Sequence, residues 1–368
     1  MIPIYRPPAI PGMEEQVLSC IRSGWWGYGP ACHALEKRFT VDRGGWSLAT
    51  SSGTAALYVA ARLLHTSPED EVIVPAMTFV STAMAFLSAG FRVKVADVDP
   101  GTLTVNPETI RPVLSKHTRA VVVVHLYGQK AATPEIRQVC DESGISMIED
   151  CAHRLGLDDA GAPPADFACY SFNTVKEAAG GEGGLLWGRD TAAESRARSI
   201  SNLGLGVDTW QRSSKLRHAD YQFCEEVGLK FRLQDISATM VNVMLDSRLE
   251  LQRKRRDIFR RYDEAFRNSS PRLAPLVRGP DDSCLMYVLK VSGRGRDRLR
   301  RVMAAGGVAT SVHYPSLSRH PLLEGPDHSC PVAEEAAGEV MTLPCYPDML
   351  PDEQLQVIRT TLGAINEI

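Results

Sequence analysis

The chain has 368 residues, and 44 acidic against 41 basic side chains give it a formal net charge of −3. This length allows two or three domains with sizeable cores, and a composition of 44% hydrophobic and 23% charged residues excludes a disordered, collagen-like or small disulfide-rich chain. A net charge this close to zero gives no general attraction to nucleic acid or to an anionic membrane. We therefore expect an enzyme that acts on small molecules.

The cysteines and the N-terminal residues indicate in which cellular compartment the protein works. The nine cysteines are odd in number, irregularly spaced and without a Cys-x-x-Cys pair, which is typical of reduced thiols in a reducing compartment. The first 15 residues contain four prolines and no apolar stretch after a basic start, so they do not resemble a signal peptide. We expect a cytoplasmic protein.

Residues 72–91 form 20 consecutive uncharged residues, a length that could span a bilayer. However, Pro75 interrupts this stretch, and hydroxyl side chains are scattered through it. We interpret it as a short β-branched strand at 72–74, a turn at Pro75 and a buried helix from about Val80. The sequence therefore predicts no association with a membrane.

Short, mostly apolar runs of three to six residues recur along the first half of the chain. Helical segments separate several of them: residues 51–64 are rich in alanine and leucine, and residues 134–143 begin with a proline and end before Gly144. This alternation predicts an α/β fold in which helices flank a mostly parallel sheet. The predicted strands are 72–74, 93–96, 120–124, 145–148, 167–172 and 185–187.

The pattern changes after Gly228. Apolar residues at helical spacing around 236–244 continue into the polar run 252–261 without a helix breaker, which predicts one long helix leaving the first domain. A smaller unit follows from about Leu273, with a strand at 286–291 and helices at 296–305 and 352–365. We predict a large α/β domain over residues 1–245, then a linking helix and a small α+β domain over residues 246–368.

A lysine follows the strand predicted at 167–172. Lys176 stands before a glycine-rich bend at residues 180–184, in the region after a strand where open α/β sheets bind their ligands. Small neighbours can exclude water from such an amine, which lowers its pKa and makes it a nucleophile towards a carbonyl group. Taken alone, the pattern also fits a solvated loop lysine beside Glu177.

Two further segments carry groups that can bind a phosphate and a heteroaromatic ring. Residues 51–57 place small residues before an apolar helix, where backbone amides and the helix dipole can bind phosphate, although a plain helix cap is the commoner explanation. Glu149 and Asp150 end an apolar strand, and a carboxylate there can keep a heteroaromatic nitrogen protonated, which makes the ring an electron sink. Alternatively, Asp150 caps a helix and His153 is a structural histidine.

A phosphate site, an acid at a strand end and a lysine before glycines are together the groups that bind pyridoxal phosphate. With these motifs the sequence resembles the DegT/DnrJ/EryC1/StrS family of sugar aminotransferases, which have the aspartate aminotransferase fold (fold type I). The resemblance covers nearly the whole chain and implies a large domain with a seven-stranded, mostly parallel sheet. The matching motifs are at 23–30, 52–57, 70–75, 78–79, 125–129, 149–153, 171–172, 176, 181–184, 313–315 and 343–347.

The resemblance implies a role for each matching residue. Lys176 forms the Schiff base with pyridoxal 5′-phosphate and later moves a proton between substrate and cofactor, while Asp150 pairs with the pyridine nitrogen. Gly53, Thr54 and Ser171 bind the cofactor phosphate. Phe79 stacks on the cofactor ring, which suits a flat apolar face.

Two positions depart from the family pattern. The family usually has Gln where this chain has His153, and an imidazole there can still contact the ring hydroxyl of the cofactor. The family usually has Asn where this chain has Lys230, and that Asn reaches the phosphate in the neighbouring subunit. Lys230 could do so as a point charge or could point into solvent.

Four residues, near the two ends of the chain, are candidates for substrate binding. They are Tyr28 near the N-terminus and His313, Tyr314 and His320 in the small domain. The segment between Gly204 and Gly228 contains three aromatic residues and is where we expect substrate specificity to be decided. We find no spacing typical of metal ligands, and we interpret the basic run 253–261, which has acids within and beside it, as a solvated helix face rather than a nucleic-acid site.

The resemblance also implies the reaction. Sugar 3-dehydratases related to this family carry histidine at the lysine position, so Lys176 favours an aminotransferase. It would take an amino group from glutamate or glutamine, leaving pyridoxamine 5′-phosphate, and pass it to a keto group of a nucleotide-linked sugar or cyclitol in surface-polysaccharide or natural-product biosynthesis. The site would be built from two subunits of a homodimer. The alternatives are a dehydratase or lyase on the same scaffold, and a regulatory protein that holds the cofactor without turnover.

Overall fold

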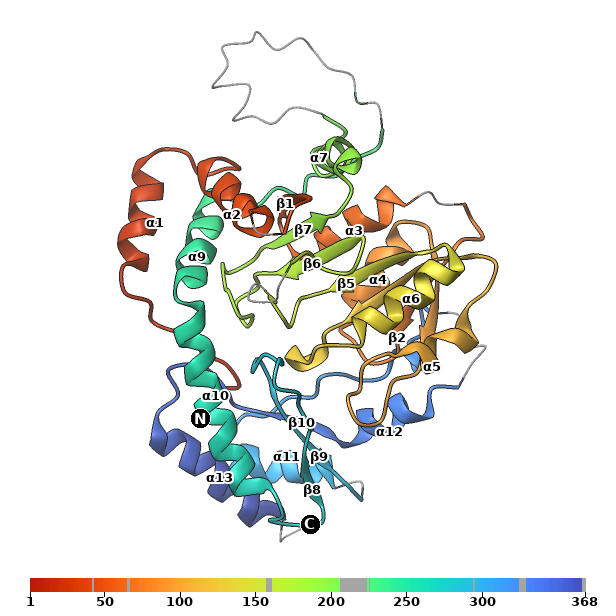
Figure 1. Ribbon diagram of the computed structural model, residues 1–368. Coiled ribbons are helices and arrows are strands. Elements are labelled where there is room, and N and C mark those ends of the chain that lie inside the picture. Colours follow the sequence, from red (N-terminus) through yellow and green to blue (C-terminus); the bar gives the residue numbers. More distant parts are fainter. Residues whose placement is uncertain are drawn as a thin grey trace.

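A seven-stranded sheet forms the centre of the larger unit (Figure 1). The computed structural model describes residues 1–41, 43–64, 67–156, 161–205, 224, 226–293, 295–323 and 329–365. The strand order is β1-β7-β6-β5-β4-β2-β3, and β7 is antiparallel to both of its neighbours while the other pairs are parallel. This confirms the predicted α/β fold with a mostly parallel sheet. The strands are β1 (Trp46–Thr50), β2 (Glu71–Pro75), β3 (Arg92–Ala96), β4 (Thr118–Val124), β5 (Ser146–Asp150), β6 (Phe167–Ser171) and β7 (Gly184–Gly188).

The strands of this sheet are apolar runs because both faces of the sheet are covered. Successive side chains of a strand point to opposite faces: Val72 and Val74 belong to one apolar cluster, and Ile73, between them, belongs to another. The six strands predicted from apolar runs are present. Strand β1 was not predicted, because Ser47 and Thr50 interrupt its apolar residues, yet all five of its residues are buried.

Helices pack against both faces of the large sheet and against the second unit (Figure 1). They begin where the sequence supplies the expected signals, such as Ser52, whose side chain caps the first turn of α3 by accepting from the amide of Ala55. The described helices are α1 (Met13–Arg22), α2 (Pro30–Thr40), α3 (Gly53–Leu63), α4 (Ser81–Ser88), α5 (Pro107–Ile110), α6 (Thr133–Ser143), α7 (Glu194–Ile200), α9 (Asp235–Asp246), α10 (Arg248–Phe266), α11 (Arg296–Ala305), α12 (Pro331–Glu339) and α13 (Pro351–Ile365).

The long uncharged stretch at 72–91 contains strand β2, which ends at Pro75, and helix α4. Within the described part of the chain, no helix is both long and apolar enough to cross a membrane. The interpretation of this stretch as a strand, a turn and a buried helix is therefore confirmed.

A three-stranded antiparallel sheet forms the second unit, in the order β10-β9-β8. Its strands are β8 (Leu273–Pro275), β9 (Tyr287–Val291) and β10 (Val340–Leu343). Apolar side chains from this sheet and from α10, α11 and α13 form a separate core cluster. Ile2 also packs in this cluster and pairs with Val308, so the first residues of the chain lie with the C-terminal unit. The division of the chain near residue 245 stays a prediction.

The connection between the two units differs from the single long helix that we predicted. Helix α9 ends at Asp246 and helix α10 begins at Arg248, with Ser247 between them at φ −95° and ψ 2°. The amide of Ser247 lies near the carbonyls of Leu245 and Met244 instead of making the regular bond four residues back. Periodicity alone does not reveal such a break, because both helices keep an apolar face on either side of it.

Candidate active site

The predicted lysine and acid lie beyond the carboxyl ends of neighbouring strands. Asp150 is the last residue of β5, Ser171 is the last residue of β6, and β5 and β6 are parallel neighbours. Lys176 follows in the connection from β6 to β7. Because parallel strands end at the same edge of a sheet, this edge gathers the three residues at the place where open α/β sheets bind ligands.

The buried carboxylate of Asp150 accepts two hydrogen bonds. Its Oδ2 accepts from the hydroxyl of Thr82 at 2.8 Å, and its Oδ1 accepts from the amide of Ala152 at 3.0 Å. Burial raises the pKa of the Asp150 carboxyl above its ordinary value, against the opposite effects of these bonds and of the positive charge of Lys176. A cationic ring nitrogen beside it would stabilise the anion. Thr82, on helix α4, was missed from the sequence because a threonine in an apolar helix carries no motif.

Lys176 has an amine that is easily deprotonated. Burial lowers its pKa from the ordinary lysine value to about 8, although the charge of Asp150 acts in the other direction. Near pH 8, about half of the molecules therefore carry a free amine that can attack a carbonyl group. The structure thus gives Lys176 the desolvated setting that its small neighbours suggested, rather than that of a solvated loop lysine.

Glycines allow the loop between β6 and β7, residues 172–183, to pack tightly; we call it the lysine loop because it contains Lys176. A Cβ atom added to Gly180 would lie 2.7 Å from Val241 and 2.9 Å from the carbonyl of Ser237, both on α9. Gly183 has φ +155°, a conformation that side chains other than glycine rarely adopt. The glycine-rich bend therefore allows the loop after Lys176 to lie directly on α9, which helps to exclude water from the amine.

The start of helix α3 offers donors that could bind an anion. The first backbone amides of an α-helix have no acceptor within the helix. At the start of α3, the side chain of Ser52 accepts a hydrogen bond only from the amide of Ala55, at 3.0 Å. Gly53 brings this end of α3 against Ser171, because a Cβ atom on Gly53 would lie 3.0 Å from the Cβ of Ser171. The amides of Gly53 and Thr54, together with two serine hydroxyls, thus stand at the positive end of the helix dipole.

His153 connects two tyrosines. Its Nδ1 accepts from the amide of Tyr127 at 3.1 Å, so Nε2 carries the proton of the neutral ring and lies 3.1 Å from the hydroxyl of Tyr314. Burial, followed by the charge of Lys176, lowers the pKa of His153 well below its ordinary value, which keeps the ring neutral. A neutral Nε2–H donates to the Tyr314 oxygen and leaves the phenol proton for another acceptor.

The small unit reaches the same edge of the sheet through residues 313–320. The hydroxyl of Tyr127 donates to the carbonyl of His313, and the amide of Leu317 donates to the carbonyl of Ala76 at 2.8 Å. The rings of Phe79 and Tyr314 lie 5.5 Å apart, and Phe79 is 52% exposed. An exposed flat ring beside Tyr314 suits stacking on a heteroaromatic cofactor.

His313 and His320 differ in their surroundings. Nδ1 of His313 lies 2.8 Å from the hydroxyl of Thr342, and burial, with the charge of Lys176 as a smaller cause, lowers the pKa of His313 to about 4. Nδ1 of His320 accepts from the amide of Leu322 at 3.3 Å, and His320 is half-buried. Hence His313 belongs electrostatically to the surroundings of Lys176, and His320 lies farther along the same segment.

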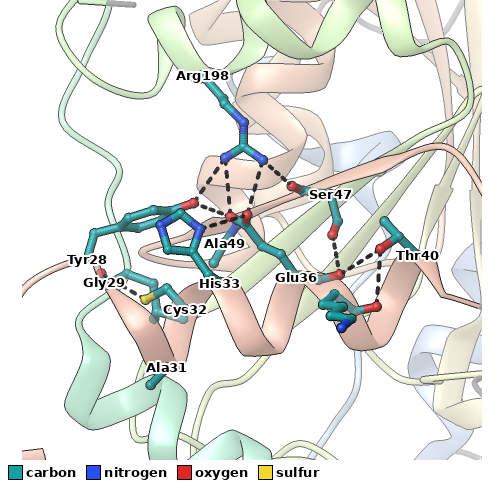
Figure 2. A network of polar contacts seen from close by, with 12 residues as sticks. Tyr28, Gly29, Ala31, Cys32, His33, Glu36, Thr40, Ser47, Ala49 and Arg198 are labelled. Atoms are coloured by element: carbon teal, nitrogen blue, oxygen red, sulfur yellow. Dashed lines mark hydrogen bonds and ion pairs between the residues drawn. The ribbon is translucent and has the colours of Figure 1, made fainter. Parts of the chain in front are cut away.

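Tyr28 is engaged inside the protein. Its hydroxyl contacts the carboxylate of Glu36 and lies 3.1 Å from the guanidinium of Arg198, and only 7% of its surface is exposed. Figure 2 shows Arg198 reaching from α7 to Glu36 and Tyr28, which lie on and beside α2. The guanidinium of Arg232 covers the other side of the Tyr28 ring, 3.7 Å from its centre. These contacts engage the hydroxyl and one face of the ring within the chain, and the part of Tyr28 in substrate binding stays a prediction.

Replacing Glu36 by glutamine should destabilise the protein by about 3 kcal/mol, because it leaves the partly buried guanidinium of Arg198 without its closest buried carboxylate. Burial opposes ionisation of Glu36, but its bonds with His33, Arg198 and Tyr28 outweigh burial and lower the Glu36 pKa. The stabilisation should therefore be present at neutral pH and be lost as the pH falls through this lowered pKa. Unfolding in urea at neutral and acidic pH measures both effects.

Glu194 offers a matched control for this prediction. It also pairs with Arg198, at 2.8 Å, but 37% of its side chain is exposed against 8% for Glu36. The change Glu194→Gln should therefore cost less than about 1 kcal/mol. Equal losses of stability in the two variants would contradict the prediction that the buried pair with Glu36 stabilises the protein more than the exposed pair with Glu194.

Two predicted sites lie away from this cluster or outside the described residues. Lys230 is exposed, and its backbone pairs with that of Asn202. The next residue, Phe231, accepts from the amide of Ser51 at 2.9 Å, so Lys230 stands near the phosphate end of the site without being part of its buried groups. Most of the segment 204–228, where we expect specificity, including all three of its aromatic residues, lies outside the described residues.

A buried cluster contains three side chains of the types that bind metal ions. His125, Glu149 and Cys151 approach one another closely. Nε2 of His125 lies 2.9 Å from Glu149, and Nδ1 accepts from the amide of Ala131 at 3.2 Å. Since Nδ1 accepts a hydrogen bond, the proton of the neutral ring lies on Nε2, which donates to Glu149, and neither nitrogen offers a free lone pair to a metal. We interpret the cluster as a structural hydrogen-bonded pair.

The residues present fit pyridoxal phosphate. The buried carboxylate of Asp150 has a raised pKa and gains from a cationic ring nitrogen, the amine of Lys176 has a lowered pKa, the start of α3 offers phosphate donors, and Phe79 offers an exposed ring. Each group therefore matches a different part of one cofactor: nitrogen, aldehyde, phosphate and ring face.

Comparisons with solved structures agree with this fit. The aminotransferase TlmJ from Streptoalloteichus hindustanus is 27% identical, with a TM-score of 0.90 over 100% of this chain and 99% of that chain. The sugar aminotransferase CalS13 from Micromonospora echinospora is 26% identical, with a TM-score of 0.85 over 99% of this chain and 100% of that chain. The putative sugar aminotransferase Spr1654 from Streptococcus pneumoniae, in its PMP form, shares the fold at 24% identity and a TM-score of 0.90 over the full length of both chains.

The family comparison extends over nearly the whole chain. The model of the DegT/DnrJ/EryC1/StrS aminotransferase family matches residues 11–361, which include all the motifs quoted above. The expected fold type I and the expected class of enzyme, a pyridoxal-phosphate-dependent aminotransferase, are thereby confirmed. The chain therefore belongs to the DegT/DnrJ/EryC1/StrS aminotransferase family.

Proposed function

We propose that this protein transfers an amino group from glutamate or glutamine to a keto group of a nucleotide-linked sugar or a related cyclitol. The observation that carries the proposal is the Lys176 amine, whose pKa is lowered to about 8, beside the buried carboxylate of Asp150. A protein that only held the cofactor would have no need for both a reactive amine and an anion that supports an electron sink. The family membership and the likeness to CalS13 support a sugar as acceptor.

The residues of the chain divide the chemistry between them. When bound, pyridoxal phosphate supplies an electron sink for the negative charge that develops on the substrate carbon. The neutral Nζ of Lys176 would accept a proton from that carbon and deliver it to the reacting carbon of the cofactor. The carboxylate of Asp150 would pair with the protonated ring nitrogen, and Gly53, Thr54 and Ser171 would hold the phosphate so that the reacting atoms keep their geometry.

The small unit supplies groups on the substrate side. Tyr314 receives the Nε2 proton of His153 and can donate its own proton into the site, which orients a substrate hydroxyl or carboxylate. His313 and His320 complete this side, and Tyr28 remains the fourth residue of the proposed substrate set. His153 also remains a proposed neighbour of the cofactor ring hydroxyl, now as a neutral donor rather than as a charge.

We further propose that the active unit is a homodimer in which Lys230 reaches the cofactor phosphate of the partner. The exposed position of Lys230, next to the residue that pairs with Ser51, supports this role. None of the nine cysteines, all of which the structure describes, forms a disulfide, which supports a cytoplasmic setting. Sugars for surface polysaccharides and for natural products are both compatible with this set of residues.

The half-reaction with an amino donor tests the proposal. Adding glutamate or glutamine to the purified yellow protein should remove its visible absorbance and release the matching keto acid. A panel of nucleotide-linked keto-sugars and ketocyclitols should then restore the colour and yield an aminated product in mass spectrometry. Loss of a sugar hydroxyl without gain of nitrogen would favour a dehydratase, and no change with any donor would favour a protein without turnover.

A further inference from the structure

A cavity borders the loop that carries Lys176, at the next residue, Glu177. Its volume is about 290 Å³, and it is bounded by Glu177, by the first turns of α10 and by residues 280–283 of the small unit. In Figure 1, α10 runs from the end of α9 towards the small unit. Among the described residues, five arginines line the cavity: Arg154, Arg248, Arg253, Arg255 and Arg256.

The acids that line this cavity are mostly engaged elsewhere. Glu177 accepts from the amide of Leu155 at 2.6 Å with one oxygen and from the side chain of Gln252 with the other. Asp282 accepts from the amides of Lys130 at 2.7 Å and Gly279 at 2.6 Å. Both oxygens of each of these carboxylates thus already accept hydrogen bonds from the protein. Asp281 is the third acid of the described lining, so five arginines face three acids and the positive charge is only partly neutralised.

Arg255 is the main reason to expect an occupant. Only 1% of its surface is exposed, and its Nε and Nη2 atoms have no hydrogen-bond partner among the described residues. The charge of Arg255 lowers the pKa of Glu177 against a larger effect of burial. Tyr5 is a neighbour of Arg255: the charge of Arg255 and its side-chain contact both lower the Tyr5 pKa against a larger effect of burial, but the Tyr5 hydroxyl, like the two nitrogen atoms, makes no hydrogen bond within the described residues. No ion pair within 4.0 Å involves Arg255 in the described part of the chain. A buried guanidinium with two unsatisfied donors is costly, and bound anions are a usual explanation of such groups.

We propose that this cavity binds a phosphate group. A guanidinium presents its donors in a planar fork that matches the oxygens of phosphate, and Arg255 has two donors still to satisfy. The other arginines of the cavity add positive charge around the same space. The site would stand directly behind Lys176, since Glu177, the next residue, forms its wall, and its occupation does not require turnover.

Titration of the cofactor-saturated protein with inorganic phosphate, at constant ionic strength, tests the proposal by calorimetry. The wild type should bind phosphate saturably without losing its cofactor absorbance, which excludes displacement of the cofactor. The change Arg255→Lys should weaken binding about tenfold, since it removes hydrogen bonds to a charged group. Titrations with acetate and glycerol phosphate complete the comparison.

Arg253 and Arg260 provide a matched pair of variants that should fold normally. Both lie on α10, both are exposed (68% and 66% of the side chain), and both pair with Asp257, but only Arg253 lines the cavity. We expect Arg253→Gln to weaken phosphate binding about threefold and Arg260→Gln to leave it unchanged.

The possible outcomes separate clearly. Binding of phosphate or of glycerol phosphate that depends on Arg253 and Arg255 supports the site, and the tighter of the two shows whether the free ion or a phosphorylated metabolite is preferred. Absence of saturable binding, equal loss in the Arg260→Gln variant, binding only with release of cofactor, or acetate binding as tightly as phosphate would each overturn the proposal. None of these outcomes depends on the amino acceptor.

Discussion

Turnover should disappear in the Lys176→Ala variant with every amino donor, falling by roughly 10⁴-fold or more, because one change removes both the nucleophile and the proton carrier. The structure gives this amine a pKa of about 8. Covalent attachment of the cofactor to the wild-type protein should therefore slow about tenfold for each unit of pH below that value, where the amine is protonated. Rates of cofactor attachment to cofactor-free protein measure this dependence.

A second readout separates chemistry from folding. Reduction with borohydride should fix the cofactor to Lys176 in the wild type and leave none attached to the alanine variant, as peptide mapping would show. Lys116→Ala, which changes an exposed lysine far along the chain from the site, is the control and should keep full activity. Turnover that persists in the Lys176→Ala variant, or attachment at another lysine, would reject the assignment.

Turnover should fall by roughly 10³-fold in the Asp150→Asn variant, because a neutral amide no longer stabilises positive charge on the ring nitrogen in a buried site. The amide has nearly the same shape and can still meet Thr82 and the amide of Ala152. The charge of Asp150 raises the Lys176 pKa against the effect of burial, so the variant should also move the pH dependence of cofactor attachment below about pH 8. Steady-state kinetics and the attachment rates give the two measurements.

Glu149 is the control for Asp150. It is the preceding residue of β5 and is equally buried, but it points to the other face of the sheet, where it binds His125 at 2.9 Å. Glu149→Gln should lower stability while changing kcat of the folded protein less than tenfold. If both variants lost activity alike, the effect of Asp150 would be one of folding and not of charge at the ring nitrogen.

The pattern of short apolar runs was enough to predict the class of fold. Because parallel strands are buried on both faces, they appear as continuous apolar segments such as 120–124, and the helices between them carry their own start and stop signals. Sequence reasoning also placed Asp150, Lys176 and the start of α3 on strand ends and a helix end, which is enough to predict that they gather at one edge of a sheet.

Other features depend on contacts between distant residues. Strand β7 enters the sheet antiparallel between β1 and β6, and nothing in its five residues indicates direction. No motif around Tyr28 indicates that Arg198, 170 residues away, contacts its hydroxyl. His153 likewise meets Tyr314 across 161 residues, so its neutral state could not be read from the motif that contains it.

Periodicity and capping are local properties of the chain, so the kind of element on which each chemical group lies can be predicted from the sequence. Which of these groups face one another, and which are removed from water, depends on how distant segments pack. The lowered pKa of Lys176 and the unsatisfied guanidinium of Arg255 both follow from burial. Burial is produced by segments far apart in the chain, and no short stretch of sequence records it.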